Sequence, residues 1–462
     1  MRCVILAAGL GSRFKSEKPK VLHTILGKPM IWHVLQVVKN SGIKDIGVVV
    51  GHKADEVIEV LKDEGVVFFH QKDPKGGTAD ALLSSASMWR SSEDYLLIIN
   101  GDSPLVKSQT IKNMERFLHM VSEYESIKLS GVLLTSFLPD PTGYGRVIED
   151  GMGNIVKVVE EKDANFEEKN IKKINSGVYI FYAPHLIESL FAIKPSEASG
   201  ELYITETFKV MYNKGYKVRS FMAEDITEAM GVNTRWDLAI AENIIRLRIL
   251  QHWAEKGNTL HQPESIWIEP DVILEGDVEI HPSVTLKGKT RIGKNSVLGR
   301  GCYIEHSTIG NNVIVEPFSL IKDSEIGDNA HLGPFVHIRN GSFIGEASQI
   351  NNFVEVKASQ IGKDVKAKHL AYIGDAHVED QTNIGAGVVF ANFDGKRKYK
   401  SYVGKHAFIG SNSLLIAPIK IGNYAYIAGG SVIDEDIEDG DLAISRPKLK
   451  AIKGKGKDRL ID

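Results

Sequence analysis

The chain has 462 residues and a mass of 51.0 kDa, which is more than one hydrophobic core usually organises, so two or more domains are expected. Hydrophobic residues make up 43% and charged residues 25%, a balance typical of folded globular proteins and not of disordered ones. A formal net charge of -3 and a pI near 6.6 give no electrostatic reason to expect a nucleic-acid partner.

Cysteine content and the lengths of apolar runs indicate the cellular compartment of the protein. Two cysteines, Cys3 and Cys302, are too few for a disulfide framework and show no metal-ligand spacing. No apolar run reaches the length of about 18 residues that a membrane helix needs, and glycines interrupt the apolar N-terminus. We therefore expect a cytoplasmic protein with no signal peptide and no membrane partner. The basic stretch from Lys448 to Arg459 is expected to be a solvated tail.

The first part of the chain alternates apolar runs with amphipathic stretches. This alternation predicts a parallel sheet covered by helices on both faces, with ligands bound in the loops at the carboxyl ends of the strands. The expected strands are Cys3–Ala7, Ile46–Val50, Val66–His70 and Tyr95–Asn100, and the expected helices are Met30–Asn40, Ala54–Lys62, Thr78–Met88 and Ser108–His119.

The loop after the first strand is rich in small residues. The segment Leu6–Arg13 reads LAAGLGSR, and Lys20 follows it. Small residues let backbone N–H groups approach an anion, while Arg13 and Lys20 supply positive charge. The segment is neither a Walker A loop nor a Gly-x-Gly-x-x-Gly loop. A glycine-rich turn alone can be a plain strand-to-helix connection, but the two cations favour phosphate binding.

Two further loops hold candidate ligand-binding residues. Asp102 follows the fourth strand and is either a Mg²⁺ ligand or a turn former that caps the next helix. Gln71 and the segment Gly76–Thr78 suit the recognition of a nucleobase edge, although Gly-Gly-Thr is equally typical of a helix N-terminus.

The second part of the chain repeats every six residues. A helical stretch over residues 234–256 precedes it and is interpreted as a spacer. From Ile268 to Ile433 an aliphatic residue opens almost every hexad, which predicts a parallel β-helix and fits neither a helical nor a strand period. The hexad at Ala367 lacks a large residue, and Phe390–Tyr402 interrupts the register and predicts an extruded loop.

Some residues in the repeat are not required by the scaffold. A single surface lysine or histidine is usually only solvated, but a cluster of polar residues among aliphatic hexads suggests function. The cluster consists of Arg339, Lys357, Lys366, Lys368, His369, Tyr372, Asn383 and Lys398.

Several motifs resemble one enzyme family. LAAGLGSR, KPKVL (18–22) and GDSPL (101–105) resemble motifs of sugar-nucleotide pyrophosphorylases, and GYGR (143–146), VEEKD (159–163), INSG (174–177) and GVNT (231–234) extend the match. With a C-terminal hexapeptide β-helix, nearly the whole chain is similar to the bifunctional N-acetylglucosamine-1-phosphate uridylyltransferases / glucosamine-1-phosphate N-acetyltransferases.

The resemblance implies a fold of the α/β plus β class. A Rossmann-like nucleotidyltransferase domain is expected over residues 1–232, a helical linker over 233–257, and a left-handed parallel β-helix with acetyltransferase activity over 258–462. It also implies a homotrimer whose partners are UTP, sugar-1-phosphates and acetyl-CoA.

For the first domain the resemblance implies Mg²⁺-dependent uridylyl transfer from UTP, which depends mainly on positioning and charge stabilisation. The implied roles are as follows: Leu6, Ala7, Ala8 and Gly9 hold the nucleotide; Gln71, Gly77 and Thr78 contact uracil; Arg13 and Lys20 stabilise phosphates; Asp102 and Asn233 ligate Mg²⁺; Gly145, Glu160 and Asn175 face the sugar. Asp80 departs from the histidine common in the family.

For the second domain the resemblance implies acetyl transfer from acetyl-CoA to an amine, which needs a base and an oxyanion site. The implied roles are as follows: His369 is the base and Glu355 orients it; Arg339 and Lys357 bind the sugar phosphate; Tyr372, Asn383 and Lys398 contact the sugar; Ala386, Asn392, Phe393, Ser411, Gly429 and Arg446 contact the coenzyme. Phe393 and Gly429 depart from the tyrosine and alanine often found in the family.

Two alternatives compete with a bifunctional enzyme. A single-activity nucleotidyltransferase would use the β-helix only for assembly or regulation and would not need His369, Lys357 and Arg339 together. A non-catalytic assembly protein would be expected to lose Arg13, Lys20 or Asp102, and all three are present.

Overall fold

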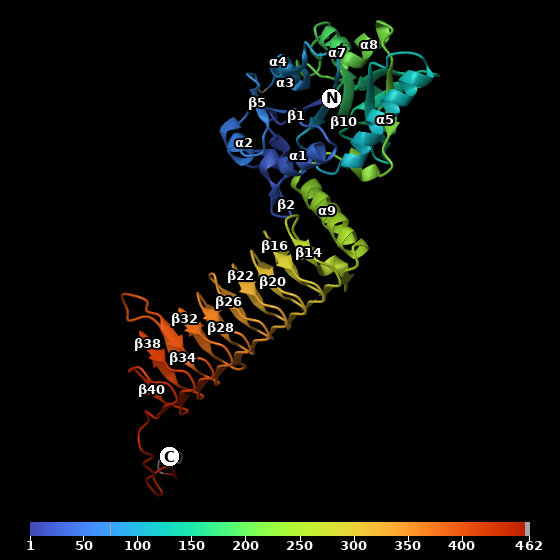
Figure 1. Cartoon of the computed structure of the whole chain (residues 1–462). Coiled ribbons are helices and arrows are strands. Elements are labelled where there is room, and N and C mark those ends of the chain that lie inside the picture. The colour runs from blue at the N-terminus through green and yellow to red at the C-terminus, as the bar shows by residue number, and fades with distance from the viewer. Residues whose placement is uncertain (74, 458–462) are drawn as a thin grey trace. The chain divides into compact units, whose positions relative to one another are not determined.

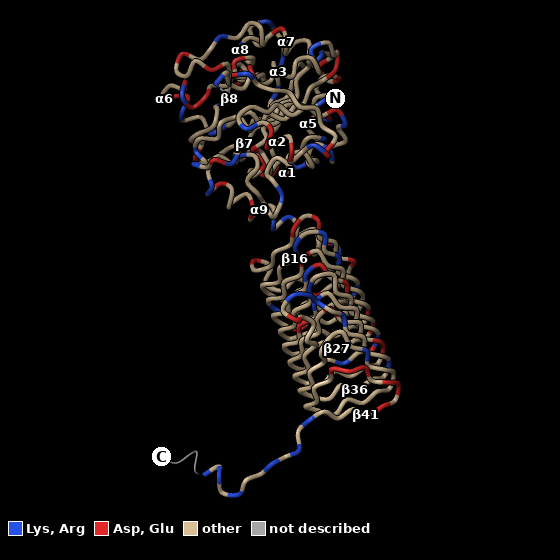
Figure 2. The backbone as a smooth tube through the Cα atoms, turned by 90° about the vertical axis from the view of Figure 1, so that its left-hand side faces the viewer, with Lys and Arg blue, Asp and Glu red and all other residues tan. Residues whose placement is uncertain are grey.

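A computed structural model describes residues 1–73 and 75–457 (Figure 1). The chain divides into two compact units, Met1–Ile245 and Arg246–Asp462, each with its own core. Within the described residues, no helix is both long and apolar enough to cross a membrane. Arg459 of the basic tail lies outside the described residues. Between 444 and 457 every charged residue is Lys or Arg (Figure 2).

The first unit is built on a nine-stranded sheet. Its order is β11 (Val218–Met222), β7 (Gly131–Phe137), β10 (Lys173–Tyr182), β6 (Tyr95–Asn100), β1 (Arg2–Leu6), β4 (Ile46–Val50) and β5 (Val67–His70). A hairpin of β8 (Arg146–Glu149) and β9 (Ile155–Val159) joins through β10. The four predicted strands are confirmed as the parallel set β1, β4, β5 and β6. Beyond this parallel set, β10 pairs antiparallel with both β6 and β7.

Helices cover both faces of this sheet. Along β1, Cys3 and Ile5 pack into one core, and Val4 and Leu6 pack into the other, as the two-residue strand period requires. The helices are α1 (Met30–Asn40), α2 (Ala54–Leu61), α3 (Gly77–Ser84), α4 (Ala86–Trp89), α5 (Ser108–Tyr124), α6 (Phe166–Lys169), α7 (Ala183–Leu190) and α8 (Glu206–Asn213).

The helix expected over 78–88 is two helices separated at Ser85. The Ser85 hydroxyl donates to the Leu82 carbonyl at 2.7 Å and accepts from the Trp89 indole at 3.1 Å. A buried serine that bonds locally competes with the helical ladder, so a short break forms there.

The carboxyl ends of the parallel strands meet at one edge. The Ala7 N–H donates to the Val49 carbonyl at 2.8 Å, and the Gly101 N–H donates to the Leu6 carbonyl at 2.8 Å. Gly51 is required at this edge, because a Cβ there would lie 2.8 Å from the Ala8 carbonyl oxygen. The loops after β1, β4 and β6 are therefore held in contact.

The second unit is a hexapeptide-repeat, left-handed parallel β-helix with three sheets. Eleven strands run from β12 (Thr259–Leu260) to β41 (Leu442–Ala443), ten from β13 (Trp267–Ile268) to β40 (Val432–Ile433), and nine from β14 (Ile273–Leu274) to β38 (Ile419–Ile421). The aliphatic residues that open the hexads are at most 4% exposed and stack on their counterparts in the next coil, as Ile268 does on Leu286. The predicted hexad register is confirmed.

The interruption of the repeat is shorter than expected. Phe390 points inward at 0% exposure and pairs with Leu415, so it keeps the hexad register. Tyr402 belongs to β35 (Ser401–Val403) and pairs with His377. The extruded part is a hairpin over residues 392–400, closed by a bridge between Phe393 and Lys398. Phe390 takes the position that an aliphatic residue has in the other hexads, so the six-residue repeat could not be recognised there from the sequence.

The expected connector helix is α9 (Arg235–Glu255). Its start is capped, because the Asp237 carboxylate accepts from the N–H groups of Asn233 and Thr234, and the Thr234 hydroxyl accepts from the Asp237 N–H. Its first turns also bond to the first unit: Arg235 donates to the Phe14 carbonyl, and Glu242 accepts from the Leu26 N–H.

These contacts predict where the first unit can be cut. A fragment of residues 1–245 is expected to fold alone, whereas 1–232 loses the hydrogen bonds that Asn233, Arg235 and Glu242 make to the rest of the unit. Each lost hydrogen bond costs about 1 kcal/mol, so 1–232 should melt about 5–10 °C below 1–245. Calorimetry of the two fragments tests this, and equal melting temperatures would contradict it.

Candidate active sites

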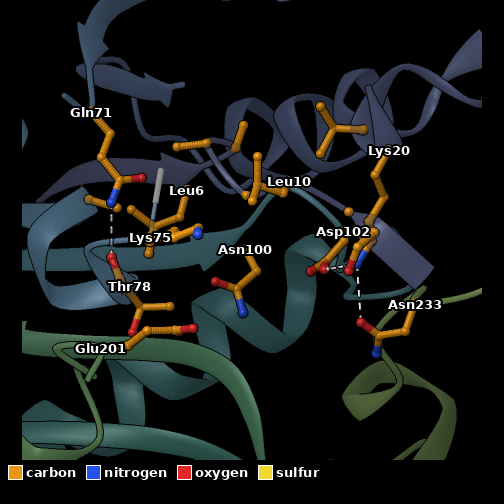
Figure 3. A pocket seen from close by; sticks show the side chains of 18 of the residues that line it. Leu6, Leu10, Lys20, Gln71, Lys75, Thr78, Asn100, Asp102, Glu201 and Asn233 are labelled. Atoms are coloured by element: carbon orange, nitrogen blue, oxygen red, sulfur yellow. Dashed lines mark hydrogen bonds and ion pairs between the residues drawn. The ribbon is translucent and has the colours of Figure 1, made fainter. Parts of the chain in front are cut away.

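The loops after β1, β5 and β6 surround a cavity of about 430 Å³ in the first unit (Figure 3). In Figure 3 Gln71 lies at one end, Lys20, Asp102 and Asn233 lie at the other, and Asn100 lies between them. The sequence-predicted residues that line it are Leu6, Ala7, Ala8, Gly9, Arg13, Lys20, Gln71, Gly77, Thr78, Asp102 and Asn233.

The loop after β1 needs glycine to pass Lys20. Gly11 has a φ of 61°, and a Cβ on it would lie 2.7 Å from the Lys20 Cβ. A short 3-10 helix (Ser12–Phe14) follows, and its Phe14 is buried against His23 at 4.9 Å between ring centroids. The buried ring anchors the loop while the neighbouring Arg13 stays exposed at the cavity.

A charged cluster forms one end of the cavity. The Lys20 Nζ lies 2.5 Å from an Asp102 Oδ and 3.1 Å from the Asn233 Oδ1. The Arg13 guanidinium also donates to the Asn233 Oδ1, at 2.8 Å. Three segments distant in sequence thus place two cations beside one carboxylate and one amide oxygen. This end suits a phosphate group together with a cation.

The opposite end is held by hydrogen bonds around Gln71. Its Nε2 donates to the Gly77 carbonyl at 3.2 Å and to an Asp80 Oδ at 2.9 Å. The Thr78 hydroxyl accepts from the Ile204 N–H at 3.0 Å. Gly77 is required, because a Cβ there would lie 2.4 Å from the Leu202 carbonyl oxygen. Asp80 therefore orients the Gln71 amide and leaves its Oε1 as the acceptor.

A second cavity of about 270 Å³ adjoins the first. It is lined by the three residues expected to face a sugar, Gly145, Glu160 and Asn175. The residues that line both cavities are Arg13, Thr78, Asn100, Asp102 and Asn233. The charged cluster consequently sits where the contents of the two cavities would meet.

Polar groups in the second cavity are firmly held. The Asn175 amide donates to the Tyr179 hydroxyl at 2.9 Å, and Thr205 donates to Glu160 at 2.9 Å. Burial raises the pKa of Glu160 above its usual range, and nearby carboxylates add to the effect. Burial also raises the pKa of the Tyr179 hydroxyl, and the charge of Glu160 adds to this shift. The side chains of Glu160 and Asn175 can hold the hydroxyl groups of a sugar.

In the second unit, one sheet face gathers cations and acids. β25 (His337–Arg339), β28 (Glu355–Lys357) and β31 (Tyr372–Gly374) pair so that Arg339 lies beside Lys357, and Glu355 lies beside Tyr372. The Lys357 Nζ is 3.8 Å from an Asp375 Oδ, and the Asn392 amide donates to that same oxygen at 2.5 Å. The hairpin is thereby tied to this face.

Lys398 of the hairpin belongs to the same cluster. Its pKa is lowered because the Lys357 ammonium lies beside it, while Asp375 opposes the shift. Two ammonium groups that repel each other gain from an anion between them, so this face suits a phosphate.

His369 lines a different cavity, of about 450 Å³, together with Lys368, Asn351 and Asn352. Glu355 was expected to orient His369, but its carboxylate accepts from Arg339 at 2.6 Å and 2.9 Å. In this chain Glu355 therefore positions Arg339. The strand period explains the difference: Glu355 and Arg339 project from the same face of one sheet, whereas His369 lies in the corner before β31.

The residues expected at the coenzyme stack at one corner of successive coils. The Asn412 N–H donates to the Ala386 carbonyl at 2.7 Å, and the Gly430 N–H donates to the Ser411 carbonyl at 2.8 Å. The Arg446 guanidinium donates to the Gly429 carbonyl at 2.9 Å. The result is a column of small side chains with a cation at its end. Asn383 lies in β33 (Asn383–Ile384), and Phe393 is exposed on the hairpin.

Comparisons with known proteins cover the whole chain. Over 461 residues it is 64% identical to the bifunctional protein GlmU of Aquifex aeolicus (strain VF5), covering 100% of this chain and 99% of that protein. The chain belongs to the bifunctional GlmU family. It is also 57% identical to the GlmU of Hydrogenobaculum sp. (strain Y04AAS1) over 99% of each chain, and 43% identical to that of Clostridioides difficile (strain 630) over 97% of this chain and 95% of that protein.

Family models match both units separately. Residues 3–122 match the MobA-like NTP transferase domain, residues 268–367 the GMPPB C-terminal domain, and residues 400–435 the bacterial transferase hexapeptide (six repeats). As a GlmU family member the protein is a bifunctional enzyme, a uridylyltransferase and acetyltransferase. The two alternatives, a non-catalytic β-helix and a non-catalytic assembly protein, are not favoured.

Several residues that line the two cavities of the first unit were not predicted from the sequence. Lys75, Asn100 and Glu201 line the first cavity, and Tyr144 and Tyr203 line the second. Lys75 directly precedes the Gly-Gly turn, so its position could have suggested a role. Nothing in the sequence marks Tyr203, which reaches the site because Leu202 pairs with Gly76 through its backbone.

Proposed function

We propose that the enzyme makes UDP-N-acetylglucosamine in two steps, one in each unit. Acetyl-CoA acetylates glucosamine-1-phosphate in residues 258–462. UTP then donates a uridylyl group to the product in residues 1–232, completed by Asn233 at the start of the 233–257 linker. The observation that carries this proposal is the presence of two complete clusters in one chain. One is a cavity with the Gln71 amide at one end and two cations at the other, and the other comprises a histidine in one corner, cations on one sheet face and a column of small residues along the β-helix.

In the uridylyl transfer, Gln71 and Thr78 hold the uracil end, while Glu160 and Asn175 hold the sugar. A phosphate oxygen of the sugar-1-phosphate attacks the α-phosphorus of UTP, and pyrophosphate leaves. Arg13 lines both cavities, and Lys20 contacts Asp102 and Asn233, which line both as well, so the two cations stabilise the negative charge that spreads over the reacting phosphate. Positioning supplies the rest of the rate enhancement.

Asp102 and Asn233 are the residues that would hold Mg²⁺. Their oxygens already flank one cation, the Lys20 ammonium, and hard oxygen donors in small number are what Mg²⁺ takes from protein when phosphates complete its shell. Bound there, the ion would supply charge neutralisation for the departing pyrophosphate.

Asp102→Ala is predicted to lower uridylyl transfer by about 10²–10³-fold, because it removes an oxygen ligand and the partner of Lys20. Acetyl transfer should be unchanged. Pyrophosphate release and thiol release, measured on the same preparation, separate the two reactions. Asp45→Ala, an exposed carboxylate at the amino end of β4, is the control. Near-normal pyrophosphate release by Asp102→Ala would move the metal site elsewhere.

Asp80 gives a second prediction, on nucleotide recognition. If it holds the Gln71 amide so that Oε1 accepts the N3–H of uracil, Asp80→Ala should raise the KM for UTP about 3–10-fold with little change in kcat. Asp55→Ala is a matched control, since Asp55 occupies the first turn of α2 as Asp80 does that of α3. An unchanged KM for UTP would remove Asp80 from base recognition.

In the acetyl transfer, His369 takes a proton from the attacking amine as the new amide bond forms and the thiolate of coenzyme A leaves. Arg339, Lys357 and Lys398 bind the sugar phosphate, with Glu355 holding Arg339 in place. Tyr372 and Asn383 contact the sugar. The coenzyme lies along Ala386, Ser411 and Gly429, with Asn392 and Phe393 on the hairpin and Arg446 at the end of the column.

His369→Ala is predicted to lower acetyl transfer by about 10²–10⁴-fold, the usual contribution of a positioned general base. Uridylyl transfer should not change. His377→Ala is the control, because His377 is another exposed histidine of the β-helix and is paired with Glu379. A His369→Ala protein with normal melting temperature and normal acetyl transfer would refute the assignment.

The assembly is proposed to be a homotrimer in the cytoplasm. One corner of the β-helix exposes a ladder of apolar side chains. Phe318, Phe335 and Phe353 stack there with ring centroids 5.5 Å and 5.1 Å apart, and Leu370 is the corresponding residue of the following coil. Exposed fractions of 46–64% for these four side chains support coverage by another copy.

A further inference from the structure

Two histidines and one glutamate converge on the outer face of the first two coils of the β-helix. The Nε2 atoms of His261 and His281 each lie 3.1 Å from the same Glu279 Oε1. One ligand atom from each of the three residues lies within 4.8 Å of the others. None of these residues belongs to either proposed active site.

Strand pairing fixes this arrangement. β12 pairs in parallel with β15 (Glu279–Ile280), so that Leu260 faces Ile280, and His261 therefore follows directly below His281. The His261 N–H donates to the Ile280 carbonyl at 2.9 Å, and the His281 N–H donates to the Leu298 carbonyl at 3.0 Å. The backbone of both histidines is therefore fixed by hydrogen bonds between coils, and their ring centroids lie 4.9 Å apart.

The chemistry of the donors selects a class of ion. We propose that His261, Glu279 and His281 bind a borderline transition-metal ion of the Zn²⁺ type, with water in the remaining position. Bonds of about 2.0–2.1 Å in a tetrahedral site place neighbouring ligand atoms about 3.3 Å apart, close to the two nitrogen–oxygen separations of 3.1 Å found here. Two imidazole nitrogens favour Zn²⁺, Ni²⁺ or Cu²⁺ over Mg²⁺, which takes oxygen ligands.

The location indicates what the ion does. Among the described residues, β12 is the first strand of its sheet and pairs with β15 alone, so its coil has another coil on one side and the second half of α9, with Leu250 and Trp253, packed against the core at this end. An ion held by His261 from one coil and by Glu279 and His281 from the next would fasten this end of the β-helix. On the third coil Val297 pairs with Glu279, so the residue at this position is apolar and does not compete with the ion for the Glu279 carboxylate.

The test uses the full-length protein after treatment with a chelator. Zn²⁺ is added at about 100 times its dissociation constant, and binding stoichiometry and the melting temperature of the β-helix are followed. One ion per chain at this site should raise the melting temperature by about 5–10 °C. Co²⁺ added in place of Zn²⁺ should give the visible absorption of a tetrahedral site with nitrogen ligands.

His261→Gln and His281→Gln should each lose one bound ion per chain, the stabilisation by Zn²⁺ and the Co²⁺ absorption. His377→Gln, which alters a histidine paired with a single glutamate, should lose none of them. The rates of acetyl transfer and uridylyl transfer are measured for each variant as a check on its folding. Equal stoichiometry and equal stabilisation in the wild type and both variants would overturn the proposal, and so would weak binding of Zn²⁺ without any thermal shift.

Discussion

Parallel pairing of strands sets the position of the candidate catalytic side chains, by a different route in each unit. In the first unit, β1, β4 and β6 end at the same edge, and the backbone bonds of Ala7 and Gly101 hold their loops together. In the second unit, each coil lies on the previous one in register, so Arg339 and Lys357 become neighbours although a whole coil separates them. The buried aliphatic residues in turn keep that register, because a shift by one residue would turn them outward.

Both sites place like charges near one another, and each relies on a nearby acid to balance them. Asp102 lies against Lys20 in the first unit, and Asp375 lies near Lys357 and Lys398 in the second. A phosphate group entering either cluster would complete the balance, which explains why cations outnumber acids at both positions. The shared substrate feature, a sugar-1-phosphate, fits this common solution on two unrelated folds.

The sequence predicted most elements because their patterns are local. Helix α1 has the predicted bounds, and the hexads from Ile268 to Ile433 face inward as expected. Local pattern could not reveal the direction of β10, because a buried apolar run is the same in parallel and antiparallel pairs. Nor could it place Glu355 with Arg339 or bring Tyr203 to the second cavity of the first unit, since both depend on contacts between distant segments. The candidate residues of the first site converge on adjoining cavities, whereas those of the second divide between one sheet face and a corner.

The central claim is that one chain performs both reactions in order. The most direct measurement follows thiol and pyrophosphate separately in a mixture of glucosamine-1-phosphate, acetyl-CoA, UTP and Mg²⁺. Thiol should appear first and pyrophosphate after a lag, and omission of acetyl-CoA should abolish both. With N-acetylglucosamine-1-phosphate, pyrophosphate should appear at once and without thiol. Pyrophosphate release from glucosamine-1-phosphate at an undiminished rate without acetyl-CoA, or no thiol release at all, would contradict the account.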